Sequence, residues 1–167
     1  TFPYSTDITF LTTDDVGPMA LVTNIQALPL SGGSVPLQDF LNMLGPGGYE
    51  IRQNYTPADN TSWTFEPNVP ANQATYVTLP YRPDGQPAGP GLYYLWIDNP
   101  VVAGDTRLAG HSAPAGRGSL APESGRGSGY DTSMILAISH YQVTFKVSAT
   151  EAFIWAVDLR TGAPASG

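Results

Sequence analysis

The stretch SMILAISHYQVTFKVSATEAFIWAVDLRTGAP, residues 133–164, determines the expected fold because it holds three strand-like runs with almost nothing between them. In the second and third runs, alternate residues form two apolar series: Tyr141, Val143, Phe145 and Val147, then Phe153, Trp155, Val157 and Leu159. A two-residue period predicts pleated strands, each with one buried face. Connections this short predict antiparallel neighbours, or strands that step from one sheet to another. The stretch therefore predicts an all-β domain.

The remainder of the chain offers further strands and one helix. Strands are expected over 5–13, 19–30, 61–66, 74–81 and 91–98. The last of these, GLYYLWID, has large side chains on both faces, which is typical of a central strand covered on both sides.

The single expected helix lies between the second and third of these strands. Ser34 is its candidate cap and Pro36 lies in its first turn. Its apolar stripe consists of Leu37, Phe40, Leu41 and Leu44, and it is expected to lie on a sheet or to plug an open end. The glycine-rich run 45–48 ends it.

Composition excludes several classes of function. The chain has 167 residues, no cysteine and a net charge of −7, so thiol catalysis, disulfides and a basic nucleic-acid surface are not expected. No run approaches the ~20 apolar residues of a membrane span. Gly and Pro number 18 and 16, which indicates many turns between the strands.

Residues 103–129 differ in composition from their surroundings. They contain seven Gly, four Ser and two Pro and lack aromatic residues, which predicts a flexible loop inserted between two strands. The alternative is a partner-binding or protease-sensitive loop. Its possible protease-sensitive sites are Arg107, Arg117 and Arg126.

The sequence predicts no catalytic, cofactor-binding or metal-binding residue. The two histidines, His111 and His140, have no fixed spacing to carboxylates, and no nucleophile elbow, phosphate loop or zinc motif occurs. Asp14 and Asp15, with Asp7 nearby, favour a turn over the alternative of a calcium site. A further set of aromatic residues favours core positions over an exposed sugar-stacking platform: Trp63, Trp96 and Trp155.

Three stretches of the chain are similar to motifs of one protein family. The run FIWAVDLRTGAP, residues 153–164, is similar to a Val-Trp-Val-Thr-Asp-Leu-x-Thr-Gly-Lys-Pro signature, with Ala163 in place of Lys. The run GPGLYYL, residues 89–95, resembles the Leu-Pro-Pro-Gly-Leu-Tyr motif that ends the preceding domain in that family, and residues 24–44 resemble a third motif, which ends in Phe-Leu-x-Leu-Leu. Together the three stretches resemble bacterial alpha-2-macroglobulin-like proteins.

The resemblance implies a fibronectin- or immunoglobulin-like antiparallel β-sandwich of macroglobulin type, with one short helix. Residues 1–138 would form this sandwich, and residues 139–167 either its last hairpin or the opening strands of the next domain. The chain would be a non-catalytic, cofactor-free module from the N-terminal region of a longer protein that inhibits endopeptidases by trapping them. The family's Cys-x-Glu-Gln thioester is not in this chain, which has no Cys.

The implied partners are neighbouring domains of the same chain and, through the full-length protein, target proteases. The implied location is extracellular, periplasmic or anchored at the cell surface. The alternative function is an adhesion or carbohydrate-binding module, which predicts exposed aromatic residues at Trp63, Tyr76, Tyr93 and Tyr94.

Overall fold

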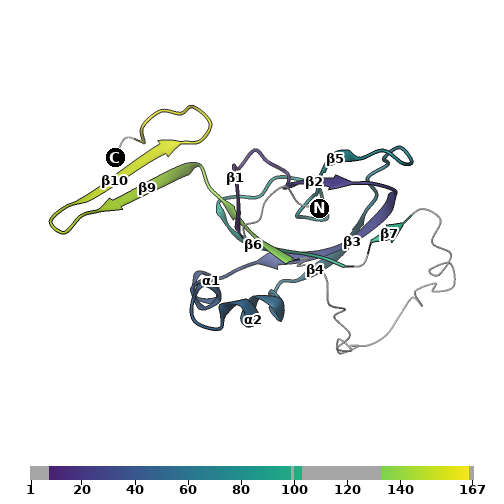
Figure 1. Ribbon diagram of the computed structural model, residues 1–167, viewed down its shortest axis with the longest axis horizontal. Coiled ribbons are helices and arrows are strands. Elements are labelled where there is room, and N and C mark those ends of the chain that lie inside the picture. The colour runs from purple at the N-terminus through teal and green to yellow at the C-terminus, as the bar shows by residue number, and fades with distance from the viewer. Residues whose placement is uncertain (1–7, 99, 103–132, 166–167) are drawn as a thin grey trace.

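The computed structural model describes residues 8–98, 100–102 and 133–165, and Figure 1 shows two facing sheets, a pair of helices and a projecting hairpin. Arg107, Arg117, Arg126, His111 and Asp7 lie outside the described residues. The strands are β1 (Ile8–Leu11), β2 (Met19–Val22), β3 (Ile25–Ser34), β4 (Thr61–Phe65), β5 (Thr75–Thr78), β6 (Gly91–Ile97), β7 (Val101–Val102), β8 (Ser133–Ile138), β9 (Tyr141–Val147) and β10 (Ala152–Asp158). The helices are α1 (Leu37–Leu44) and α2 (Gly48–Gln53), so the described residues hold two helices where the sequence predicts one.

The larger sheet has the strand order β1-β8-β6-β3-β4, with β7 also paired to β3. Its neighbours are antiparallel except for β1 and β8, which run parallel from the pair Ile8–Ile135 to the pair Leu11–Ile138. The smaller sheet is formed by the antiparallel strands β2 and β5. The all-β sandwich predicted from the sequence is confirmed, with this one parallel pair as an exception to its antiparallel pattern.

The single strand expected over 19–30 is wrong, because the chain breaks at Thr23 and Asn24 and passes from one sheet to the other. Asn24 has a φ of 57°, outside the range of a strand. The Asn24 side chain donates to Oδ1 of Asn72 at 3.1 Å and accepts a bond from the backbone N–H of Asn72. These bonds fix the corner at which β2 of the small sheet becomes β3 of the large one.

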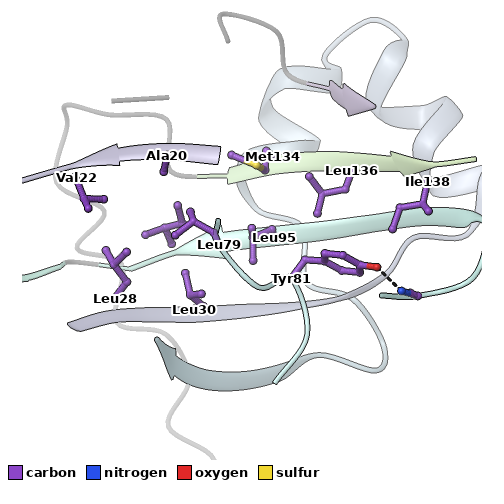
Figure 2. Close-up of a cluster of buried hydrophobic side chains, with 12 residues drawn as sticks. Ala20, Val22, Leu28, Leu30, Leu79, Tyr81, Leu95, Met134, Leu136 and Ile138 are labelled. Carbon is purple, nitrogen blue, oxygen red and sulfur yellow. Dashed lines mark hydrogen bonds between the residues drawn. The ribbon is translucent and has the colours of Figure 1, made fainter. Parts of the chain in front are cut away.

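The main core fills the space between the two sheets (Figure 2). Its buried residues come from both sheets and from the segment that follows β5: Ala20, Val22, Leu28, Leu30, Leu79, Tyr81, Ala88, Leu95, Ile97, Met134, Leu136 and Ile138. Leu79, Leu95 and Leu136 are completely inaccessible to solvent. Removing this apolar area from water is the main force that holds the sheets together.

A second core lies on the opposite face of the large sheet, under the helices. It contains Val35, Met43, Tyr94 and Ile135, with Phe40 and Tyr55 packed against it. Neighbouring residues of β6 therefore alternate between the two cores, with Leu95 in one and Tyr94 in the other. The prediction that 91–98 is covered on both faces is confirmed.

The predicted contact face of α1 is only partly right. Phe40 packs on the sheet together with Met43, whereas Leu37, Leu41 and Leu44 are exposed. The predicted Ser34 cap is wrong, because Ser34 ends β3 and its hydroxyl donates to Asp59 at 2.8 Å. Helix α1 instead follows Pro36, whose carbonyl accepts the first helical bond from Phe40 at 3.0 Å.

Candidate functional site

The hairpin formed by β9 and β10 is the part of the fold that most needs a functional explanation. It projects from the end of the sandwich in Figure 1, and every residue of β9 is exposed. Its large apolar side chains reach exposed fractions of 66% at Val147, 65% at Ile154 and 61% at Phe145. A contiguous apolar surface of this kind is a mark of an interaction site or of an incomplete core.

The strand register divides the hairpin into two different faces. Paired residues of an antiparallel ribbon share a face, so Phe145 and Ile154 lie together. The wholly apolar face extends along most of the ribbon and comprises Val143, Phe145, Val147, Ala152, Ile154 and Ala156. We call these six residues the apolar hairpin face.

The opposite face mixes aromatic and polar residues. Phe153 is paired with Lys146 and Trp155 with Thr144. The rings of Phe153 and Trp155 stack with centroids 6.4 Å apart and an interplanar angle of 9°. Sequence alternation gives the two apolar series, but it does not show that the aromatic series of β10 lies on the face opposite to Phe145.

Short polar contacts fix the root of the hairpin on the sandwich. Ser139 donates its backbone N–H to the carbonyl of Leu11 at 3.1 Å. The Nδ1 atom of His140 lies 3.0 Å from the hydroxyl of Thr13, and the His140 carbonyl accepts the N–H of Leu159 at 2.8 Å. The hairpin is therefore held at a two-residue joint.

The far end of β10 leads into a turn that brings the chain back beside the strand. Oδ1 of Asp158 accepts the backbone N–H of Thr161 at 2.8 Å, and this bond is the main reason why the pKa of Asp158 is lowered. The turn brings Pro164 opposite Val157, and Ala165 donates its N–H to the carbonyl of Ala156 at 2.9 Å. The chain thus turns back along the free edge of β10.

The histidine and aspartate residues that the sequence analysis weighed as candidates form no common site where the structure describes them. His140 contacts Thr13, and no carboxylate bonds to its ring among the described residues. Asp15 accepts bonds from the N–H and the hydroxyl of Thr12 at 2.7 and 2.8 Å, which confirms the turn interpretation. No group of three His, Cys, Asp or Glu residues suited to a metal ion occurs within the described ranges.

The carbohydrate-binding alternative predicts that four aromatic side chains are exposed, and the structure gives the burial of each. Trp63 and Tyr93 pack against the main core, Tyr94 is 2% exposed, and only Tyr76 of the four is well exposed, at 58%. The prediction that the tryptophans are core residues holds for Trp63 and Trp96 and is wrong for Trp155, which is 45% exposed.

The β-sandwich is similar in fold to solved structures of a bacterial alpha-2-macroglobulin, which agrees with the fold that the sequence resemblance implies. A crystal structure of native alpha-2-macroglobulin from Escherichia coli spanning domains MG0-NIE-MG1 is similar at a TM-score of 0.56 and 12% identity, over 97% of this chain and 46% of that one. A structure of the same protein spanning NIE-MG1 is similar at a TM-score of 0.59 and 13% identity, over 97% of this chain and 71% of that one.

These comparisons establish a likeness of fold. This chain spans about half the length of the longer E. coli fragment. No family model matches the chain, and no curated protein matches its sequence. Because 97% of the chain is covered, the hairpin is included in the likeness together with the sandwich. Among the described residues no helix is long and apolar enough to cross a membrane.

Proposed function

We propose that this chain is a non-catalytic structural module of a large alpha-2-macroglobulin-like protein that traps proteases. Its role would be to hold neighbouring modules in position while the full-length protein encloses its target. The observation that supports the proposal is that the likeness to E. coli alpha-2-macroglobulin covers 97% of this chain, sandwich and hairpin together, in a fragment that spans domains NIE-MG1.

The hairpin favours a division of the chain into residues 1–138 and the opening strands of a following module from residue 139. The sandwich has a closed core without the hairpin, since none of its buried residues comes from β9 or β10. The apolar hairpin face has the composition of a core, yet it is exposed. Of the two alternatives for 139–167, this supports the second.

The division is tested with Phe145→Asp, which places a charge on the apolar hairpin face, and with Thr144→Asp as a matched control on the other face. In a chain that continues through the following module, Phe145→Asp is expected to abolish that module's melting transition, because a buried carboxylate without a partner is very costly. Thr144→Asp should preserve it. Loss of the sandwich transition in the Phe145→Asp variant would show that the hairpin belongs to the first domain.

Protease trapping itself is tested on the full-length protein. After incubation with a trypsin-like protease, activity should persist toward a small peptide substrate and fall sharply toward a large protein substrate. The control is the same protease incubated with heat-unfolded protein, which should lower neither of the two activities. Equal loss of both activities would indicate ordinary active-site inhibition, and no loss would overturn the proposal. Trapping also implies a location outside the cytoplasm, which fractionation of the producing cell would test.

A second candidate function, binding of carbohydrate, rests on the stacked rings of Phe153 and Trp155. They are flanked by Thr144, Lys146 and Gln142 on the same face, and aromatic rings beside polar groups suit sugar recognition. Titration with oligosaccharides, read by tryptophan fluorescence, would distinguish this candidate. A saturable change that Trp155→Ala abolishes would favour it over a purely structural role.

A further inference from the structure

Helix α1 presents an apolar stripe to solvent. Leu37, Leu41 and Leu44 are spaced i, i+4 and i+7 and therefore lie on one face, with exposed fractions of 65%, 51% and 56%. The helix is already anchored by a different pair, Phe40 and Met43, which contact the second core. A surface helix ordinarily turns polar residues outward, so this stripe has the character of a contact surface.

Helix α1, which carries the stripe, and the hairpin both follow strands that end at the same end of the large sheet. Ser34, the last residue of β3, is paired with Tyr93 of β6, and Tyr93 is paired with Leu136 of β8. Val35 then donates its N–H to the carbonyl of Leu92 at 2.8 Å. Helix α1 therefore begins at the same end of the large sheet as the end of β8, from which the hairpin departs, with β6 between the two strands.

The connection between the sandwich and the hairpin is too short to let a following module move away. Only Ser139 and His140 separate β8 from β9, and two residues span at most about 7 Å. Both residues are also hydrogen-bonded to the end of β1 and the loop that follows it, through Leu11 and Thr13. A module built on the hairpin therefore begins at this end of the sandwich.

We infer that the exposed stripe of α1 is the docking surface for the module that β9 and β10 begin, an inference that rests on the proposed function. The two modules pack as a rigid pair. The chemistry that fits is an apolar surface, because the stripe is aliphatic. Its rim should lack acidic side chains, because the nearby charged side chains of α1 and α2 that are exposed or half-buried, Asp39 and Glu50, are both acidic. Tyr49 and Ile51 of α2, also exposed, enlarge the apolar area.

The test is hydroxyl-radical footprinting, read by mass spectrometry, on two proteins: the 167-residue chain and the chain continued through the following module. Labelling of Leu37, Leu41 and Leu44 is expected to fall several-fold in the longer chain, together with labelling of the apolar hairpin face. Leu41→Glu should restore labelling of Leu37 and Leu44 in the longer chain. Asn42→Asp, which adds the same charge on the opposite side of the helix, should not.

Labelling of the apolar hairpin face distinguishes failure of the docking inference from failure of the proposed function. If the hairpin is protected in the longer chain and the stripe stays fully labelled, the docking inference is wrong and the proposed function stands. If neither is protected, the proposed function fails as well. Protection of the stripe in the 167-residue chain that grows with concentration and is lost in Leu41→Glu would assign it to a second copy, which also overturns the inference. Unchanged thermal melts of both variants in the shorter chain establish that α1 remains folded.

Discussion

Replacement of Tyr81 by Phe tests the account of how the long loop after β5 is held to the main core. The Tyr81 side chain is 3% exposed, and its phenolic oxygen accepts the backbone N–H of Ala88, which is itself buried (Figure 2). The Tyr81 ring also packs against Tyr93, with centroids 5.6 Å apart. Tyr81→Phe keeps the ring contacts and removes only the acceptor of a buried N–H group.

The expected loss follows from that unpaired group. A buried donor left without a partner costs about 1–3 kcal/mol, so the free energy of unfolding should fall by this amount. For a domain of this size each kcal/mol lowers Tm by roughly 2–4 °C. The expected loss is larger than for an exposed hydrogen bond because Ala88 is buried and water replaces the hydroxyl poorly there.

The measurement is equilibrium unfolding in urea, followed by tryptophan fluorescence. Tyr76→Phe is the matched control, because Tyr76 is 58% exposed and the same hydroxyl is removed where water can replace it. The control should change the free energy of unfolding by less than about 0.5 kcal/mol. Equal effects of the two substitutions, or a neutral Tyr81→Phe, would refute the reasoning.

Three further outcomes are expected. Gly17→Ala should destabilise the fold by about 1–3 kcal/mol in urea unfolding, because the added methyl group would overlap the carbonyl of Leu79, whereas Gly89→Ala, with open space around it, should be neutral or slightly stabilising. Burial, followed by the Asp39 hydrogen bond, raises the pKa of Tyr55 to about 12. The contribution of Tyr55 to stability is therefore complete below the unfolded pKa of about 10 and is lost between about pH 10 and 12. Tyr55→Phe should reduce the alkaline fall in Tm, and an unchanged fall would contradict this. Brief digestion by a trypsin-like protease, read by intact mass, should cut first within 103–129, with the sandwich remaining associated, and early cuts elsewhere would contradict the sequence prediction. The cuts are expected after Arg107, Arg117 and Arg126.

The sequence by itself determined where most of the strands lie and how thoroughly one of them is buried. Alternation is a local property of the pleat, so the three runs of 133–164 were predictable as β8, β9 and β10. Large residues on both faces of 91–98 likewise predicted a strand between two cores, and Leu95 and Tyr94 lie in one core each. The end of α1 was also predictable, because glycine and proline follow it directly.

The tertiary structure alone decided which segments pair and which faces meet. The corner at Asn24, the parallel pairing of β1 with β8, and the outward stripe of α1 depend on partners that lie far away in the sequence. The hairpin shows the same limit, since only the register places Ile154, and not Trp155, beside Phe145. A shift of one residue would exchange the two faces. Local alternation cannot choose between such registers, because the choice depends on the burial of whole faces against distant strands.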